Sequence, residues 1–172
     1  MKSNAITLRE VRETDLESLF EWLNDVELRN LSAAYRPVSW LEHVKWVTDI
    51  LKSGEENFFV IAFDDSPIGV VHLTNVSQIH RSAEFSIRIG DSKYRGKGYG
   101  TQALRLLMEF CWNHMNLHRL TLYVLTSNTP AIKSYQKVGF ENEGCLREAV
   151  YINGRWHDLN IMSILNPNEL KS

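Results

Sequence analysis

With 172 residues, 44% of them hydrophobic and 23% charged, the chain is long enough for one compact domain over residues 1–172 and too short for two comfortable ones. Its formal net charge of −2, from 19 basic and 21 acidic side chains, argues against a dedicated nucleic-acid binder, which usually has a basic face. The chain has no run of about 18 uncharged apolar residues, and residues 1–12 lack an apolar signal segment, so we expect a cytoplasmic protein that does not cross a membrane.

The N-terminal third of the chain predicts one short strand, at residues 6–9, followed by two helices. Thr14 and Asp15 offer N-cap chemistry for the first helix. Apolar residues recur on one face of that helix at positions Leu16, Leu19, Phe20 and Leu23. The second helix is predicted from Ser39 to about residue 52, because Glu42 stands three residues after Ser39 and completes a capping box.

Three strands are predicted in the middle of the chain. Residues 58–63 and 68–73 are apolar runs, and the polar segment 64–67 between them is typical of a hairpin turn. Residues 83–89 alternate between apolar and polar side chains. One face of this strand carries Ala83, Phe85, Ile87 and Ile89, and the other carries Glu84, Ser86 and Arg88.

The C-terminal half begins with a glycine-rich loop and an amphipathic helix over residues 100–114. The elements predicted after it are a strand at 120–125, a helix at 130–138, and two strands at 144–152 and 156–165 that are joined by the turn residues Asn153-Gly154. The whole order is β-α-α-β-β-β-α-β-α-β-β. This order predicts an α/β protein of the α+β kind, with a mixed sheet flanked by helices.

The loop at residues 95–101, Arg-Gly-Lys-Gly-Tyr-Gly-Thr, lies between a predicted strand and the long helix. Glycines let backbone N–H groups approach a ligand, and a helix N-terminus adds partial positive charge, so the segment predicts an anion cradle. A P-loop needs four residues between its first glycine and Gly-Lys-[Ser/Thr], whereas five separate Gly90 from Gly96. A dinucleotide fingerprint needs a glycine where Thr101 stands and an acidic residue that segment 120–126 lacks.

What remains is Arg-x-x-Gly-x-Gly at Arg95, Gly98 and Gly100, which resembles the pyrophosphate loop of the GNAT acetyltransferase superfamily. A second segment, residues 128–140, resembles the family pattern Asn-x-x-Ala-x-x-x-Tyr-x-x-x-Gly-Phe at every fixed position. It follows the first motif by one helix and one strand. The likeness extends over about residues 6–165 and is nearest to the RimJ/RimL-like branch, with similarity to bacterial spermidine and nucleotide amino-sugar N-acetyltransferases.

The resemblance implies a mostly antiparallel sheet of about seven strands with four or so helices, and acetyl-CoA as cosubstrate. It also implies that backbone amides of residues 95–101 hold the pyrophosphate, while Arg95 and Lys97 either add charge or are solvated loop side chains. Asn128 binds the pantetheine arm, caps the following helix, or does both. The full set of predicted coenzyme-binding residues is Ile87, Ile89, Arg95, Gly96, Lys97, Gly98, Tyr99, Gly100, Thr101, Asn128, Ala131 and Lys133.

Two side chains are predicted to take part in proton transfer. Tyr135 matches the family tyrosine and is the candidate general acid toward the coenzyme sulfur; the structural alternative is a tyrosine that packs a helix against the sheet. Glu84 is the candidate base for the amine proton, through water, or a plain exposed strand residue. His80 is the histidine nearest to this site, and Cys111 and Cys145 lie outside any metal-ligand spacing, so no metal site is expected.

The acceptor amine is expected to bind the segment between the first strand and residue 58. Its polar and aromatic candidates are Trp22, Asp25, Glu27, Arg29, Tyr35, Arg36 and Trp40. Asp25 and Glu27 favour a cationic polyamine, whereas Arg29 and Arg36 favour a phosphate-bearing acceptor such as a nucleotide-linked amino sugar. A protein N-terminal amine and an aminoglycoside stay open as well.

One function of a different class also stays open. A domain of this fold that binds acetyl-CoA without transferring it would act as a sensor or assembly part, although Tyr135 and Asn128 argue for an enzyme. Expected partners are an amine acceptor and, in a homodimer or larger homo-oligomer, further copies of the chain. Neither a nucleic acid nor a membrane is expected.

Overall fold

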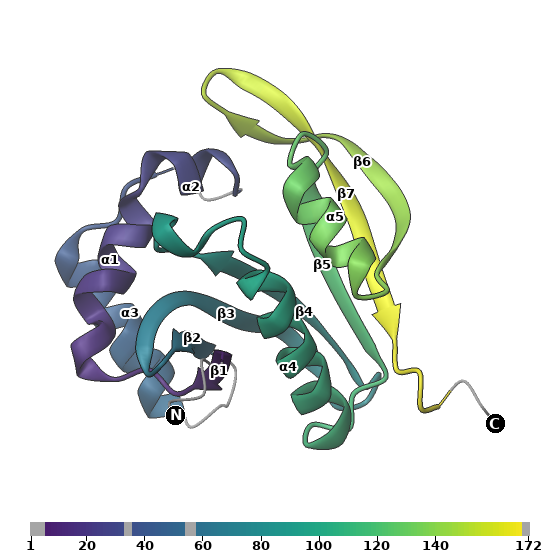
Figure 1. Cartoon of the computed structure of the whole chain (residues 1–172). Helices are drawn as coiled ribbons and strands as arrows, with labels where there is room; N and C mark the ends of the chain where they lie inside the picture. The colour runs from purple at the N-terminus through teal and green to yellow at the C-terminus, as the bar shows by residue number, and fades with distance from the viewer. Residues whose placement is uncertain (1–5, 33–35, 54–57, 170–172) are drawn as a thin grey trace.

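The computed structural model describes residues 6–32, 36–53 and 58–169, and its centre is a seven-stranded sheet in the order β1-β2-β3-β4-β5-β7-β6 (Figure 1). The strands are β1 Ile6–Arg9, β2 Phe58–Phe63, β3 Ser66–Ser77, β4 Ser82–Ile89, β5 Arg119–Leu125, β6 Glu141–Ile152 and β7 Arg155–Leu165. Neighbouring strands are antiparallel except β4 and β5, which are parallel. The predicted mixed and mostly antiparallel sheet is confirmed.

Five α-helices surround the sheet in the described part of the chain. They are α1 Leu16–Asn24, α2 Val26–Asn30, α3 Trp40–Ser53, α4 Tyr99–Asn113 and α5 Thr129–Lys137, with short 3-10 turns at Glu13–Asp15 and Ser92–Tyr94. Figure 1 shows α1, α2 and α3 grouped together, away from α4 and α5. The fold is therefore the α+β arrangement that the sequence predicts, with helices on both faces of the sheet.

Strand β2 shows how the two faces of the sheet form two separate cores. Phe59 and Ile61 point to the face covered by α4, where they join the larger core with Leu104. Phe58 and Val60 point to the other face and join the smaller core that α1 and α3 complete. Because both faces are covered, β2 is an unbroken apolar run, where a strand with one solvated face would alternate.

Strands β4 and β5 pair over only a short stretch. Their parallel register covers Ser82 to Glu84 opposite Arg119 to Thr121, although both strands run on past these positions. Beyond Glu84 and Thr121 the strands separate, as Figure 1 shows. The facing backbone edges of β4 and β5 are therefore open at their C-terminal ends, in the middle of the sheet.

The observed elements match the predicted ones, with small differences in their ends. Strand β3 continues to Ser77 and β6 begins at Glu141, while the one-turn helix α2 was not predicted because five residues carry too little periodicity. The Ser39–Glu42 capping box is present, with the Ser39 N–H donating to Glu42 Oε2 at 2.9 Å and the Glu42 N–H donating to Ser39 Oγ at 3.3 Å.

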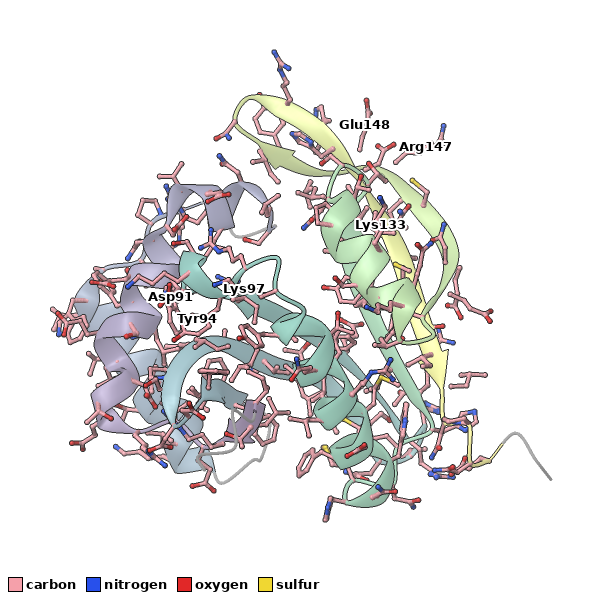
Figure 2. All side chains as sticks on the ribbon, viewed as in Figure 1. Asp91, Tyr94, Lys97, Lys133, Arg147 and Glu148 are labelled. Carbon is pink, nitrogen blue, oxygen red and sulfur yellow. The ribbon has the colours of Figure 1, made fainter. Side chains whose placement is uncertain are left out.

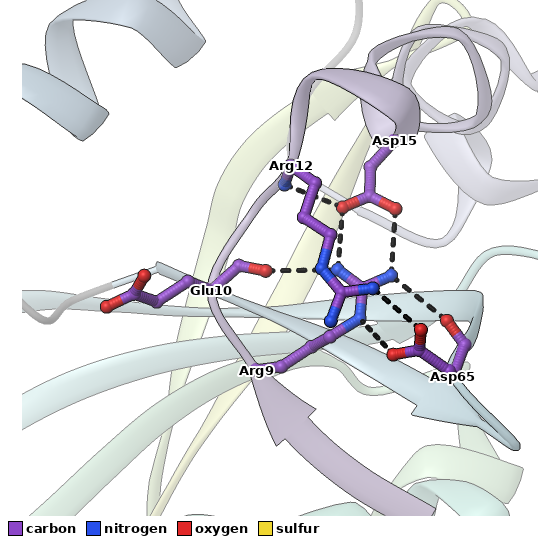
Figure 3. A network of polar contacts seen from close by, with 5 residues as sticks. All are labelled: Arg9, Glu10, Arg12, Asp15 and Asp65. Carbon is purple, nitrogen blue, oxygen red and sulfur yellow. Dashed lines mark hydrogen bonds and ion pairs between the residues drawn. The ribbon is translucent and has the colours of Figure 1, made fainter.

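The predicted N-cap of α1 is wrong in its chemistry. Asp15 precedes α1, but its carboxylate accepts hydrogen bonds from Arg9 at 2.7 and 2.9 Å and from the Arg12 N–H at 2.8 Å (Figure 3), and Thr14 is exposed. Burial alone would raise the pKa of Asp15, but the bonds from Arg9 and Arg12 outweigh it and lower the pKa below its usual value. Asp65 binds Arg12 from the β2–β3 turn, so this network fastens β1 to that turn.

Candidate active site

A cavity of about 790 Å³ opens where β4 and β5 separate. Its walls come from β4, β5, the loop before α4, the first turn of α4, and α5, with α2 at one end. The predicted site residues that line it are Glu84, Ile87, Ile89, Arg95, Gly96, Gly98, Tyr99, Gly100, Thr101, Asn128, Ala131, Lys133 and Tyr135. Two sequence motifs that lie about 30 residues apart are thereby brought to one cavity.

Lys97 is the predicted site residue that does not line this cavity. Its side chain is exposed on the loop before α4, while Lys133 lies on α5, across the opening (Figure 2). Of the two, only Lys133 is placed to contribute charge to the cavity wall.

The glycine loop has the geometry of an anion cradle. Gly96 and Gly98 have φ angles of 72° and 84°, in the left-handed region that glycine adopts without strain. An added Cβ at either position would meet no atom within 4 Å, so open space lies beside the backbone. Gly98 is the N-cap of the 15-residue helix α4 and offers no side-chain cap, which leaves the N–H groups of the first turn to a ligand. These residues fit the pyrophosphate of acetyl-CoA.

Arg95 is held by the protein's own groups. Its Nε donates to the Ile89 carbonyl at 3.1 Å, its Nη2 to the Gly90 carbonyl at 2.6 Å, and its Nη1 to Glu27 Oε2 at 2.8 Å. Its backbone N–H donates to the Ser92 carbonyl at 3.2 Å, so this amide is engaged within the loop. The set of free backbone donors therefore begins at residue 96, one residue later than predicted.

Helix α5 places Tyr135 on the cavity wall. Asn128 caps the helix, because its Oδ1 accepts from the Ala131 N–H at 3.3 Å, and Tyr135 follows two turns later with 8% of its surface exposed. Its ring packs at 6.3 Å from Phe85 and 6.0 Å from Phe140. Burial raises the pKa of Tyr135 to about 12, so the phenol is neutral at physiological pH. Packing and cavity lining are thus combined in this one residue.

Glu84 stands where the pairing of β4 with β5 ends. It is half-buried, lines the cavity, and lies opposite Thr121 in the parallel register. Tyr123 of β5 donates to Glu84 Oε1 at 3.5 Å and lines the same cavity. Sequence analysis did not single out Tyr123. The sequence carried no signal for Tyr123, because the pairing of its strand with the strand of Glu84 is seen only in the structure.

Arg88 is another cavity residue that was not among the predicted site residues. Its Nη1 is buried and has no hydrogen-bond partner among the described residues, and burial lowers the pKa of its guanidinium. Arg88 shares the polar face of β4 with Glu84 and Ser86, which the alternation of residues 83–89 had already indicated.

The acidic candidates for the acceptor segment are already engaged. Asp25 caps α2 by accepting from the Leu28 N–H at 2.9 Å and lies 3.5 Å from Arg95, and Glu27 pairs with the same arginine. The two carboxylates predicted to attract a polyamine are therefore paired with Arg95 of the glycine loop, and Glu27 is still largely exposed.

The other candidates of this segment are dispersed. Trp22 is buried and packs on Gly90, where an added Cβ would lie 2.0 Å from the indole ring. Arg36 pairs with Glu42 at 3.4 Å on the surface, and the buried Nε of Arg29 has no hydrogen-bond partner within the described part of the chain. Trp40 is exposed at the start of α3, and Tyr35 lies outside the described residues.

No metal site is formed by the described residues. They contain no cluster of three or more histidine, cysteine or acidic side chains able to hold an ion. His80 is exposed and does not line the cavity. None of the helices in the described ranges is long and apolar enough to cross a membrane.

Comparison with known proteins points to one family. The sequence profile of the GNAT acetyltransferase domain matches residues 5–141. A spermidine N(1)-acetyltransferase of Vibrio cholerae is 31% identical over 170 residues, which cover 98% of this chain and 97% of the relative. A spermidine N(1)-acetyltransferase of Escherichia coli K12 is 38% identical over 109 residues, covering 63% of this chain and 58% of the relative.

Solved structures give the same result. The spermidine N-acetyltransferase of Vibrio cholerae in complex with CoA and spermine has a TM-score of 0.88 and 30% identity, over 96% of this chain and 98% of that one. A dodecameric structure of the Vibrio cholerae enzyme in an intermediate state has a TM-score of 0.81 and 31% identity, with 96% of each chain covered. The likeness thus covers the fold of almost the whole chain.

Proposed function

Because the chain belongs to the GNAT acetyltransferase family, whose members use acetyl-CoA, we propose that it moves the acetyl group directly onto a primary amine while both substrates are bound. The observation that carries the proposal is one cavity that the glycine loop, Glu84 and Tyr135 line together. A direct transfer needs no covalent intermediate on the protein. It needs the amine and the thioester held together, with a proton acceptor and a proton donor in reach.

The coenzyme end of the cavity is assigned to the glycine loop and α4. Free N–H groups of residues 96–101 and the positive end of the 15-residue helix α4 favour a pyrophosphate, and Lys133 adds a positive charge from α5. When bound, the thioester of acetyl-CoA supplies the acetyl group. We assign Ile87, Ile89, Asn128 and Ala131 to the pantetheine path because they line the same cavity as this loop and Tyr135.

Glu84 is assigned the role of proton acceptor for the amine. A primary amine is mostly protonated at neutral pH and attacks a carbonyl only after losing its proton. Glu84 lies at the point where β4 and β5 part, within reach of a water or an amine in the cavity, and Tyr123 donates to its carboxylate. An anionic carboxylate there stabilises positive charge on the amine and accepts its proton directly or through water.

Tyr135 is assigned the role of proton donor. Its pKa of about 12 keeps the phenol protonated over the whole working pH range, so a donor is available when the sulfur leaves. The aromatic contacts with Phe85 and Phe140 restrict its ring. A fixed donor costs less reorganisation when charge develops on the sulfur.

Free thiol release is the test. Purified protein is incubated with acetyl-CoA and spermidine, spermine, nucleotide-linked amino sugars, aminoglycosides or N-terminal peptides. Thiol release that depends on the amine supports the proposal and gives the acceptor class. Tight binding of acetyl-CoA with no release from any amine would instead support a binding domain without catalysis, and failure to bind acetyl-CoA would contradict the assignment of the loop.

A homo-oligomer is a further expectation. It is supported by the likeness to a dodecameric structure and by the aromatic pair Tyr151 and Trp156, which lies 5.1 Å apart near the tip of the β6–β7 hairpin with 54% and 60% of the two residues exposed. Light scattering on the purified protein measures the mass, and a monomer at all concentrations would remove this expectation.

A further inference from the structure

The polar face of β4 holds a positive charge that the described protein does not neutralise. Arg88 lines the cavity, and the buried Nη1 of its guanidinium has no hydrogen-bond partner in the described ranges. Arg88 also lines a small pocket of about 120 Å³ with mostly apolar walls, including Trp22 and Val70. A buried guanidinium is stable only when an anion or several hydrogen bonds compensate for its lost hydration.

Charges around the cavity do not provide that compensation. Among its described lining residues Glu84 is the single carboxylate, against Arg88, Arg95, Lys133 and Lys137. Arg95 is paired with Asp25 and Glu27, so these acids are not available to Arg88. Burial lowers the pKa of His72 on the neighbouring strand, and a histidine supplies no negative charge in either protonation state. The wall around Arg88 is therefore short of negative charge.

The coenzyme is not placed to supply the missing anion. The first turn of α4 lies against the other face of β4, where an added Cβ at Gly100 would be 3.7 Å from Ile89. Arg88 shares its face with Glu84, the residue assigned to the acceptor amine. The anion that Arg88 can bind therefore belongs on the acceptor side.

We propose that the acceptor amine carries an anionic group, a phosphate or a carboxylate, which Arg88 binds while the amine lies at Glu84. The proposal rests on the transferase function proposed above and specifies its acceptor. Glu84 and Arg88 are four residues apart on one strand, so their Cα atoms are about 13 Å apart. A guanidinium binds either oxyanion through two parallel hydrogen bonds, and the same charge repels a polycation.

Matched series of amines test the proposal. We would compare α,ω-diamines with ω-aminoalkyl phosphates and ω-aminoalkyl carboxylates of equal chain length, at saturating acetyl-CoA. We expect kcat/KM to favour one anionic series by about tenfold or more at an optimal chain length. Which series leads distinguishes a phosphate from a carboxylate acceptor. An alkyl phosphate or carboxylate without the amine should inhibit competitively with the amine and not with acetyl-CoA.

Variants connect the preference to this residue. Arg88→Met keeps the length and apolar contacts of the side chain, and should reduce the anion-over-diamine ratio of kcat/KM by about tenfold or more, whereas Arg88→Lys should retain part of it. Arg105→Met, on the exposed face of α4 and away from the cavity, is the matched control and should leave the ratio unchanged. Circular dichroism and thermal unfolding verify that each variant is folded, and calorimetry separately measures its CoA affinity.

Three outcomes would overturn the proposal. The first is a preference of the unmodified enzyme for diamines at every length, with no inhibition by the alkyl anions; this result needs no variant. The second is a lowered CoA affinity of Arg88→Met with the amine ratio intact, which would assign the guanidinium to the coenzyme. The third is an Arg88→Met variant in which both quantities are unchanged. The failure of all amines to release thiol is a different result and would count against the transferase function itself.

Discussion

Arg95 of the glycine loop donates to Glu27 of α2 across 68 residues of sequence, at 2.8 Å. The same guanidinium binds the carbonyls of Ile89 and Gly90 at the end of β4. One side chain thus ties the loop assigned to the coenzyme to the strand and the helix that flank the acceptor side. We assign Arg95 a positioning role.

Replacing Arg95 by methionine should weaken CoA binding by about tenfold, because the loop loses three hydrogen bonds that fix its path. Glu27→Gln is the control. Glu27 is largely exposed, and exposed ion pairs contribute little, so its CoA affinity should change by less than about twofold. Calorimetric titration with CoA measures both variants. Equal losses would show that the pair with Glu27, and not the strand carbonyls, positions the loop.

Alanine substitutions at two glycines with similar backbone conformations distinguish an effect on ligand binding from an effect on stability. Gly98 and Gly154 have φ angles of 84° and 79°, and an added Cβ would meet nothing within 4 Å at either. Alanine at each position should therefore cost a similar free energy of unfolding, about 1–2 kcal/mol. Only Gly98→Ala should also weaken CoA binding, because its Cβ enters the space beside the α4 N-terminus. Denaturant unfolding and CoA titration check both; equal CoA affinity in the two variants would contradict the loop assignment.

Tyr135→Phe should lower kcat by about tenfold or more and change the CoA dissociation constant by less than about twofold, since the ring contacts with Phe85 and Phe140 remain. Its raised pKa sets a second expectation. A phenol with a pKa of about 12 stays protonated below that pH, so Tyr135 should cause no alkaline decline in rate up to about pH 10. Rates of thiol release measured at a series of pH values test this expectation. Unchanged kcat in the variant would remove Tyr135 from the mechanism.

Glu84→Gln should remove the rising acid limb of the pH dependence of kcat/KM for the amine, because the amide cannot accept a proton. Tyr123→Phe is the companion variant, since it removes only the hydrogen bond at 3.5 Å to Glu84. We expect this second variant to keep the acid limb, because Glu84 is still present to accept the proton. An identical profile in Glu84→Gln and the unmodified enzyme would rule out a base role.

Glu143 should make stability depend on acid pH. Hydrogen bonds from Arg119 and Ser163 lower the pKa of Glu143 to about 2, from an ordinary 4.5. A carboxyl whose pKa is lower in the folded state adds stability above the unfolded pKa and loses it as the pH falls toward the folded one. Urea unfolding between about pH 5 and pH 2 should therefore show a steeper loss for the unmodified protein than for Glu143→Gln. Parallel losses would mean that this ion pair, which is partly exposed, is screened by solvent.

Local sequence patterns predicted much of the fold because the relevant forces are local. The Ser39–Glu42 capping box, the Asn153-Gly154 turn and the alternation of residues 83–89 each depend on neighbours within a few positions. The N-cap prediction for Asp15 was wrong, for a reason that is not local. An aspartate before a helix is typical of an N-cap, but Arg9 competes for the same oxygens, and the sequence does not show that β1 brings this arginine near.

In the candidate site too, local patterns were predictable and contacts between distant segments were not. The glycine loop and the segment 128–140 are each a continuous run of residues. Their residue types and spacing were therefore enough to predict the coenzyme that binds and most of the cavity residues. Whether Arg95 and Lys97 would face a ligand was not predictable, because that depends on Glu27 and on the carbonyls of β4 for one and on solvent for the other.

The sequence by itself therefore determined the family, the order of elements and the coenzyme loop, because backbone conformation and phosphate binding are encoded in short runs of residues. Only the tertiary structure decided that β4 and β5 separate after Glu84 and that Asp25 and Glu27 form ion pairs with Arg95. It also decided that the buried Nη1 of Arg88 has no hydrogen-bond partner among the described residues. These are pairings between distant segments. Their energies depend on distance and burial, which exist only once the chain has folded.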